Sequence, residues 1–384
     1  MINAVSRKKL LIIFGTRPEA IKLFPVIATL RDDPQIAPVV CVSGQHREML
    51  DQVLQIAGLV PDHDLDLMRR GQSLDALTAA LVIGLGRVMD RERPARVLVQ
   101  GDTATAMAGA MAAYYRRIPV DHVEAGLRSG EIYHPWPEEG ARRIVTALAD
   151  LHFAPTQAAR SALLAENVAD ERIFVTGNTV IDALHWVSDR IAEQPNLVSG
   201  LANLKSQFAG KRIIAVTSHR RENLDGGLQR ITCALRRIAE RRDVALVFPV
   251  HPNPAVRDVV NAALAGLDNV ALVPPLDYPH FVHLLTLAEV VLTDSGGVQE
   301  EAPALGKPVL VLRETTERPE GIAAGTARLV GTDPERIVAE VDRLLDDAAA
   351  HRAMAHARSP YGDGRAAQRI VSIIRRKLWP EVTT

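Results

Sequence analysis

Short apolar runs alternate with amphipathic segments of helical length along the whole 384-residue chain. The runs LLIIF (10–14), VLVQ (97–100) and IIAV (213–216) are continuous and rich in Leu, Ile and Val, and segments such as 75–93 separate them. Continuous apolar strands are typical of parallel sheets that helices cover on both faces. The sequence therefore predicts an α/β protein.

The chain predicts two similar halves. Segment 8–22 and segment 211–224 each combine a basic flank, an apolar strand, and Arg and Glu at the strand end. A single core usually fills at most about 250–300 residues, so two domains are expected. The segment between the halves carries Pro and Gly with weak periodicity, which places a linker near residues 180–211.

We therefore expect domains at residues 1–179 and 180–364. Segment 365–384 has apolar residues at helical spacing and could pack on either half, and we assign it to the first.

The composition excludes several classes of binding partner. The 45 basic and 46 acidic residues are interspersed, without the basic stripe that nucleic-acid binding needs. Two cysteines, Cys41 and Cys233, are too few for a disulfide framework, and none of the twelve histidines forms an HxxxH or HExxH pair for a metal. No apolar stretch approaches the ~20 residues of a membrane span. We expect a cytoplasmic protein with no nucleic-acid, membrane or metal partner.

Acidic residues follow two central strands and one proline-rich turn. VLVQGD ends on Asp102, VDHVE ends on Glu124, and PWPEE supplies Glu138. Ligands of open parallel sheets bind outside the carboxyl ends of the strands, so these are three candidate site carboxylates. The neighbouring Glu139 is expected to face solvent or to complement a helix start.

The segment 293–311 predicts a strand, a glycine turn, a helix and a strand. Gly296 and Gly297 would let backbone N–H groups at the helix start approach a phosphate, and Glu300 or Glu301 could accept from ribose hydroxyls. A purely structural turn remains an alternative. No GxGxxG or GxxxxGK[ST] follows the first strand, which disfavours dinucleotide and P-loop sites.

Cations near the strand ends could hold a diphosphate, and for each one a solvated surface charge is the alternative. They are Arg17, Lys22, Arg220, Arg221 and Arg318. His219 directly follows a strand, where a structural and a functional histidine are both compatible with the pattern.

Several motifs occur as a set from Leu10 to the 360–366 segment: FGTRPEAIK (14–22), QHREML (45–50), HVEAGLR (122–128), PWPEE (135–139), TGNTVIDAL (176–184), HPNP (251–254) and the segment 293–321. Together they resemble the bacterial non-hydrolysing UDP-N-acetylglucosamine 2-epimerases. The resemblance implies a glycosyltransferase-B-like fold of two Rossmann-like domains facing across a cleft, a homodimer, and no nicotinamide or metal cofactor.

The resemblance also implies roles for residues. The catalytic positions match Asp102, Glu124, Glu138 and His219. The UDP-binding positions match Ser295, Gly296, Gly297, Glu301, Arg17, Lys22 and Arg318. One departure is visible, because Ala141 stands before Arg142 where the family usually has Asn.

The implied reaction is epimerisation at C2 of UDP-GlcNAc to UDP-ManNAc, which would supply ManNAc units for cell-surface polysaccharide. The C2 hydrogen has no adjacent carbonyl, so loss of UDP from C1 must acidify it and give a glycal, to which UDP adds back. We expect Asp102 and Glu138 to be the acid/base pair and Glu124 to hold the sugar or share proton transfer. His219 would stabilise the departing diphosphate as an imidazolium.

A second UDP-GlcNAc is expected as an allosteric activator. QHRE after an apolar strand puts polar side chains at a sheet end, and we assign Gln45, His46, Arg47 and Gln72 to this site. The alternative is that QHRE only caps the following helix.

Other functions fit part of the same pattern. A UDP-sugar glycosyltransferase would require an acceptor, a nucleotide-sugar sensor would not need the three carboxylates, and a hydrolysing relative would release UDP and free ManNAc. The same chemistry on another UDP-2-acetamido sugar is also open.

Overall fold

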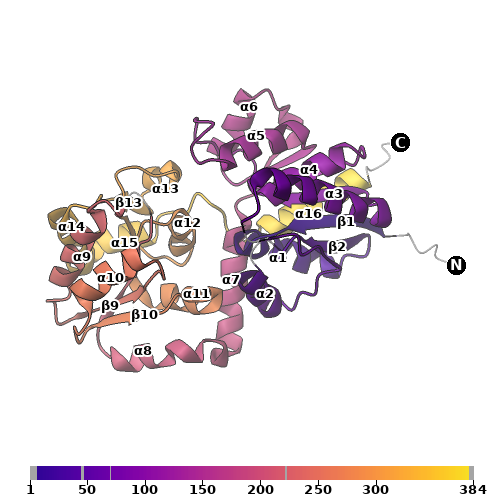
Figure 1. Ribbon diagram of the computed structural model, residues 1–384. Helices are drawn as coiled ribbons and strands as arrows, with labels where there is room; N and C mark the ends of the chain where they lie inside the picture. Colours follow the sequence, from indigo (N-terminus) through magenta and orange to yellow (C-terminus); the bar gives the residue numbers. More distant parts are fainter. Residues whose placement is uncertain (1–6, 45–46, 70, 221–222, 380–384) are drawn as a thin grey trace. The chain divides into compact units, whose positions relative to one another are not determined.

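The computed structural model describes residues 7–44, 47–69, 71–220 and 223–379. The chain folds into two compact units, one formed by the described residues of 1–183 and 361–384 and the other by those of 184–360 (Figure 1). We describe each unit by itself.

The N-terminal unit is built on a parallel sheet of seven strands in the order β3-β2-β1-β4-β5-β6-β7. Its strands are β1 (Lys8–Phe14), β2 (Ile36–Val42), β3 (His63–Asp64), β4 (Arg96–Gln100), β5 (Val120–Val123), β6 (Leu151–Ala154) and β7 (Ile173–Val175). Its helices are α1 (Arg17–Arg31), α2 (Arg47–Ile56), α3 (Leu74–Glu92), α4 (Ala104–Tyr114), α5 (Glu138–Leu148), α6 (Gln157–Ala165) and α16 (Ala366–Leu378), with a short 3₁₀ helix at Asp170–Arg172.

The C-terminal unit repeats this plan with six parallel strands in the order β10-β9-β8-β11-β12-β13. Its strands are β8 (Arg212–Thr217), β9 (Val244–Pro249), β10 (Val270–Val273), β11 (Ala288–Thr293), β12 (Val309–Val311) and β13 (Ala327–Leu329). Its helices are α8 (Ala202–Gln207), α9 (Gly227–Ile238), α10 (Pro254–Leu264), α11 (Tyr278–Leu287), α12 (Gly296–Ala304), α13 (Pro319–Ala323), α14 (Pro334–Asp346) and α15 (Ala348–Ala355).

Both sheets have Rossmann strand order, because the third, second, first and fourth strands of each unit lie side by side in that sequence. The strand order reverses between β1 and β4 in one unit and between β8 and β11 in the other. Loops diverge at such a switch point and leave a crevice at the carboxyl ends of the two strands. The predicted α/β class and the two parallel sheets are confirmed.

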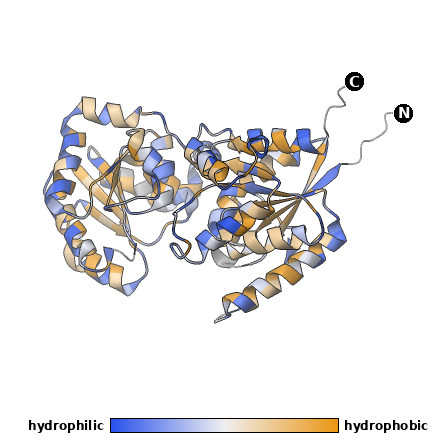
Figure 2. Ribbon diagram, turned by 90° about the horizontal axis from the view of Figure 1, so that it is seen from above, coloured by the Kyte–Doolittle hydropathy of each residue, from blue (hydrophilic) through white to orange (hydrophobic). Residues whose placement is uncertain are grey.

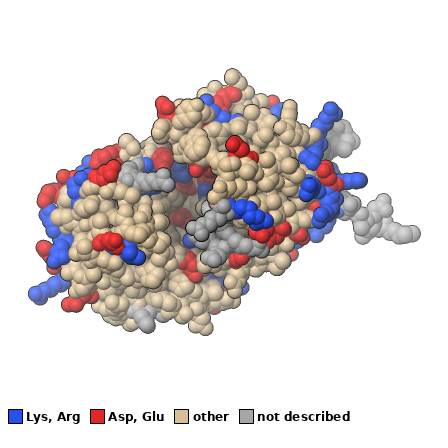
Figure 3. Space-filling model, viewed as in Figure 1, with Lys and Arg blue, Asp and Glu red and all other residues tan. Residues whose placement is uncertain are grey.

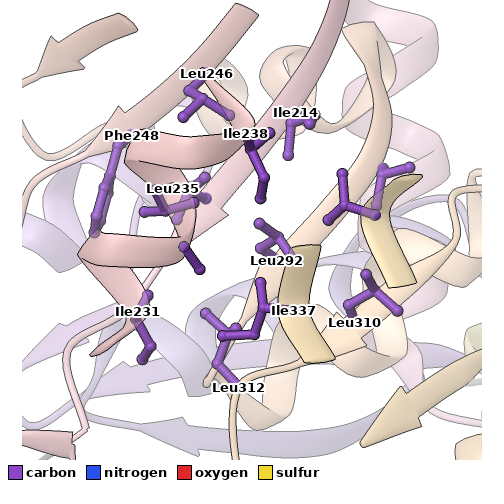
Figure 4. Close-up of a cluster of buried hydrophobic side chains, with 14 of the residues drawn as sticks. Ile214, Ile231, Leu235, Ile238, Leu246, Phe248, Leu292, Leu310, Leu312 and Ile337 are labelled. Carbon is purple, nitrogen blue, oxygen red and sulfur yellow. The ribbon is translucent and has the colours of Figure 1, made fainter. Parts of the chain in front are cut away.

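The strands form because their side chains are apolar on both faces and helices cover both. In Figure 2 the strands are mainly hydrophobic, and the helices combine hydrophobic and hydrophilic stretches. Figure 4 shows one core of the C-terminal unit, where Ile214, Leu246 and Leu292 from the strands meet Leu235 and Ile337 from the helices. Full burial of each such side chain stabilises the fold by roughly 1.5–3 kcal/mol.

Helix α4 lies close to its sheet because its residues are small. A Cβ atom at Gly109 would lie 3.2 Å from Val99 Cγ1 and 3.3 Å from Ile13 Cδ1. The helix begins at Ala104, just after Asp102, because Thr103 caps it and accepts from Ala106 N through its side chain.

The chain passes between the units twice. Helix α7 (Thr179–Glu193) carries it out of the N-terminal unit, and it returns at Tyr361 before α16. Helix α16 packs on α1, and Lys8 Nζ donates to the carbonyl of Leu378 over 2.5 Å.

The segment expected to be a linker is largely helical, with α7, a 3₁₀ helix at Pro195–Leu201, and α8. Val180, Leu184 and Val187 occur at helical spacing and are buried, so apolar burial rather than composition decides the structure there.

Candidate functional site

The turn after β1 is fixed by a capping box at the start of α1. Thr16 Oγ1 accepts from Glu19 N, and the Glu19 carboxylate accepts from the backbone N–H groups of Gly15 (3.0 Å) and Thr16 (2.8 Å). The same carboxylate accepts from Thr103 Oγ1 over 2.7 Å, which ties the turn after β4 to the turn after β1. Burial raises the pKa of Glu19, and these hydrogen bonds act in the opposite direction. Arg17 and Lys22 project from this anchored helix.

Glu124 follows β5 and is surrounded by hydrogen-bond donors. Lys22 Nζ lies 2.6 and 2.7 Å from its two oxygens, Gln100 Nε2 donates over 2.5 Å, and Asn178 Nδ2 donates over 2.9 Å. These four hydrogen bonds equal the lone-pair capacity of an ionised carboxylate. The backbone of Glu124 has φ +64°, a left-handed conformation that is uncommon for residues other than Gly. Three side chains therefore hold the Glu124 carboxylate in one orientation.

Asp102 follows β4 and is held by Arg142 of α5. Arg142 Nε and Nη2 lie 2.8 and 2.6 Å from Asp102 Oδ2, and Arg142 Nη1 lies 3.1 Å from Glu139 Oε2. Glu139 has no exposed surface, so of its two expected roles the solvent-facing one was wrong, and the position at a helix start is the one found. It is buried in the first turn of α5, where it accepts from Ser129 N and holds the guanidinium that holds Asp102.

Glu138 differs from the other two carboxylates. It begins α5, and its Oε2 atom is buried without a hydrogen-bond partner among the described residues. Buried polar atoms are rarely left unpaired, and the exceptions often have a chemical role. Three carboxylates in the N-terminal unit thus have three environments, one paired with Arg142, one saturated by neutral and cationic donors, and one with an unpartnered oxygen.

Asp294 organises the matching strand ends of the C-terminal unit. It is fully buried after β11 and accepts from Ser218 Oγ (2.9 Å) and from the backbone N–H groups of His219 (2.9 Å) and Arg220 (3.0 Å). Asn223 Nδ2 donates to the same carboxylate over 3.0 Å. One buried acid therefore fixes the loop after β8 that presents His219.

His219 stacks on His251, with ring centroids 5.5 Å apart and planes 12° from parallel. Burial lowers the pKa of His219 below its ordinary value, although Asp294 acts in the opposite direction. This environment opposes the expected imidazolium in the free protein. A bound diphosphate would favour it.

The start of α12 presents the predicted phosphate-binding turn. Cβ atoms at Gly296 and Gly297 would find only ordinary contacts, 3.7 Å from Arg220 Nη2 and 3.8 Å from Glu301 Oε2. Nothing in the fold alone demands glycine at these two positions, so the open space in front of the helix start is available to a ligand. Ser295 is the N-cap residue of α12 and makes no side-chain capping bond.

The two acids of α12 have different partners. Glu301 accepts from Tyr278 Oη over 2.9 Å, and Glu300 forms an ion pair with Arg318. Of the two, Glu301 is the acid beside the glycine turn. Arg318, expected to hold a phosphate, is held by a carboxylate in the free protein.

Comparison with known proteins identifies the family. The family model described as UDP-N-acetylglucosamine 2-epimerase matches residues 28–375. The UDP-N-acetylglucosamine 2-epimerase of Escherichia coli (strain K12) is 53% identical over 369 residues, which cover 96% of this chain and 98% of that protein. The chain belongs to the UDP-N-acetylglucosamine 2-epimerase family.

Solved structures agree with this assignment to the epimerase family. The UDP-GlcNAc 2-epimerase from Neisseria meningitidis bound to UDP-GlcNAc is similar with a TM-score of 0.88 and 42% identity, over 96% of this chain and 100% of that one. The UDP-GlcNAc 2-epimerase from Methanocaldococcus jannaschii in complex with UDP-GlcNAc and UDP gives a TM-score of 0.78 at 34% identity, over 96% and 99%. The predicted resemblance and the glycosyltransferase-B-like fold are confirmed.

The residues that hold the carboxylates were not predicted from the sequence. Gln100 ends β4 and Asn178 lies in the TGNTVIDAL motif, but only the fold brings both to Glu124. Asp294 was visible as the acid of TDSGG and was not assigned a role. Ala141, the departure from the family pattern, is buried within α5 and leaves the Arg142 contact with Asp102 intact.

The residues expected at an allosteric site stay a prediction. Gln45 and His46 lie outside the described residues, as does the candidate cation Arg221. Arg47 begins α2, and the Gln72 side chain accepts from Arg69 N over 3.1 Å.

A cavity of about 580 Å³ lies between β7 and α16. Its lining includes Phe174, Val175, Arg369 and Arg376 and none of the predicted site residues. No cluster of three or more His, Cys, Asp or Glu that could hold a metal occurs in the described ranges. Across the same part of the chain, every helix is too short or too polar to span a bilayer.

Charges of both signs are spread over the face of the molecule in Figure 3. The pattern agrees with the balanced composition and gives no continuous basic stripe on that face.

Proposed function

We propose that this family member interconverts UDP-GlcNAc and UDP-ManNAc by eliminating UDP to a glycal and adding it back. The observation that carries the mechanism is the set of three carboxylates with three different environments at the carboxyl ends of one sheet. Epimerisation at C2 needs a proton acceptor on one face of the sugar and a proton donor on the other.

In the forward direction a carboxylate removes the C2 hydrogen as a proton. The electrons of the C2–H bond form the C1=C2 double bond, and the C1–O bond breaks with its electron pair on the UDP phosphate oxygen. In the second half of the cycle a carboxylic acid protonates C2 on the opposite face and the UDP oxygen adds to C1. Atoms and electrons balance without a redox cofactor.

Asp102 and Glu138 suit these two steps. Asp102 forms an ion pair with Arg142, and Glu138 keeps an oxygen without a hydrogen-bond partner among the described residues. Glu124 already accepts four hydrogen bonds, so in this proposal it transfers no proton and instead keeps Lys22 in place beside the sugar.

The nucleotide half of the substrate is proposed to bind through the C-terminal unit. The N–H groups at the start of α12 suit the diphosphate, and Glu301 suits the ribose hydroxyls. Arg318 would exchange Glu300 for a phosphate, and Arg17 and Lys22 would add positive charge. His219 would donate to the departing oxygen.

Turnover in deuterated water tests the elimination. UDP-GlcNAc alone, without any sugar acceptor, should yield UDP-ManNAc with deuterium at C2, and proton NMR reads the exchange directly. Epimerised product that keeps a fully protonated C2 would contradict the glycal route. A requirement for an acceptor would instead indicate a glycosyltransferase.

We further propose a cytoplasmic homodimer that supplies ManNAc units for cell-surface polysaccharide and is activated by a second UDP-GlcNAc. The exposed apolar residues Ile83, Tyr114 and Tyr115 of the α3–α4 region support a self-association surface. Gln45, His46, Arg47 and Gln72 are the proposed activator residues. The M. jannaschii relative, with UDP-GlcNAc and UDP in one complex, supports simultaneous binding of two nucleotides.

A further inference from the structure

Asn178 connects Glu124 to the place where the chain passes between the units. Its side-chain Nδ2 donates to Glu124 Oε1 over 2.9 Å, and its backbone N–H donates to the carbonyl of Tyr361 over 2.7 Å. Its Oδ1 accepts from Val180 N over 3.3 Å, at the start of α7. Asn178 is 2% exposed, so these contacts form in a dry environment where hydrogen bonds are strong.

The two chain segments at this point are in backbone contact. Gly177 and Gly362 have φ values of +87° and +129°, and a Cβ at Gly177 would lie 3.1 Å from Gly362 Cα. A Cβ at Gly362 would in turn lie 3.4 Å from Asn178 N. Only glycine fits both the backbone conformation and the space. Tyr361, next to Gly362, is almost fully buried.

Asp182 reinforces the same junction without touching Glu124. Its two carboxylate oxygens accept from Ala366 N over 3.1 Å and from Ala367 N over 2.8 Å, at the start of α16. The outgoing segment 177–182 is therefore bonded to the returning segment 361–367 at several points. The N-terminal unit ends at residue 183 and resumes at residue 361, so these bonds lie at its two covalent connections to the C-terminal unit.

We infer that Asn178 is a positioning residue, through which the geometry of the paired segments 177–182 and 361–367, here called the junction, sets the orientation of the Glu124 carboxylate. Lys22 and Gln100 approach Glu124 from α1 and β4, whereas Asn178 alone of these three donors belongs to the junction. A shift of the junction would move the Asn178 amide and change its hydrogen bond to Glu124, while the hydrogen bonds from Lys22 and Gln100 would stay in place. The inference rests on the proposed role of Glu124 and assigns a function to the TGNTVIDAL motif and to the 360–366 segment.

Three substitutions test it. Asn178→Ala should lower kcat about 10–100-fold with KM for UDP-GlcNAc nearly unchanged, because small displacements of a reacting or orienting group have effects of this order. Asn178→Asp, which keeps the shape but places a second carboxylate against Glu124, should lower kcat further. Asp182→Asn is the matched control, because it weakens the junction without touching Glu124, and it should lower thermal stability while kcat changes by less than about threefold.

The order of kcat values separates positioning from stability. A purely structural role would give Asn178→Ala and Asp182→Asn the same kcat after correction for folded protein, and this result would overturn the inference. Should Asn178→Ala not fold, Asn178→Ser keeps an oxygen for Val180 N and loses only the reach to Glu124, and it must show the same selective loss of kcat.

Glu124→Gln separates this inference from the proposed function. Near-normal turnover in Glu124→Gln would refute the role of Glu124 itself. Loss of turnover in Glu124→Gln with normal turnover in Asn178→Ala would refute only the inference. If Asn178 acts through Glu124, the double variant should be no slower than Glu124→Gln alone.

Discussion

The three carboxylates of the N-terminal unit differ through their neighbours, since all are strand-end or helix-start acids of similar chemistry. Arg142 holds Asp102, three donors saturate Glu124, and Glu138 keeps a buried oxygen without a described partner. Sequence alone named these acids but could not distinguish their environments. The proposed division of proton transfer between Asp102 and Glu138 rests on the contact of Asp102 with Arg142 of α5 and on the unpartnered oxygen of Glu138.

Isosteric substitutions should separate these environments. Asp102→Asn and Glu138→Gln should lose 10²–10⁴-fold in kcat, about the usual contribution of a general acid or base. The affinity for UDP, measured by calorimetry, should stay the same because both side chains lie in the other unit from the α12 turn.

Asp90→Asn is the control for this pair. Asp90 is an exposed carboxylate that pairs with Arg116 on the surface, so its removal should leave turnover unchanged. Near-normal kcat in both Asp102→Asn and Glu138→Gln would remove them from the mechanism.

Neighbouring strands carry a pair of buried histidines. His122 of β5 and His152 of β6 are in register, and His122 Nε2 donates to the carbonyl of Gly101 over 2.8 Å. Burial lowers the pKa of His122 to about 3 and that of His152 to about 4, and the nearby charge of Arg128 acts in the same direction. The native sheet therefore holds both rings neutral beside the turn that carries Asp102.

Acid should destabilise the protein through this pair. Below pH 6.5 these two histidines bind protons in the unfolded chain, whereas their buried rings stay neutral in the native state. The free energy of unfolding therefore falls as the pH drops from about 6.5 towards 4. Each histidine should contribute about 2 kcal/mol of this loss by pH 5. Denaturant unfolding at pH 7.5 and 5.0 measures it.

His122→Gln and His152→Gln should each flatten this pH dependence, whatever their effect on stability at neutral pH. The exposed His356 supplies the control, and His356→Gln should leave the slope intact. An unchanged slope in both buried-site variants would contradict the assignment.

Strand ends were predictable at the element scale because apolar runs followed by polar residues mark them in the sequence. Pairing between distant elements was not. Gln100 reaches Glu124 because it lies opposite Val123 in the β4–β5 register, which no local pattern records. Helix α7 was assigned to a linker because the polar residues after Glu193 hid the apolar spacing before them.

The two Rossmann-like units have different sets of binding groups, and the ligand proposed here requires both. A helix start lies in the C-terminal unit, while Arg17 and Lys22 lie in the N-terminal unit. A diphosphate attracts both a helix N-terminus and cations.

UDP should therefore slow hydrogen exchange in both units. Amides at 295–299 and at 15–20 should gain protection, whereas the edge strand β10 should not change and serves as an internal control. Mass spectrometry of peptides with and without saturating UDP measures this. Protection limited to the C-terminal unit would contradict the proposed contribution of Arg17 and Lys22.

Helix α16 completes the unit that contains β1, so the N-terminal unit leaves the ribosome before the C-terminal unit but is completed after it. Residues 184–360 form a continuous unit that can fold while α16 is still unmade, and until then the α1 surface under α16 lacks its cover. Large proteins are most exposed to aggregation in such incomplete states. A stop codon just after residue 360 would thus remove few residues but leave the N-terminal unit permanently in the state that nascent chains normally only pass through.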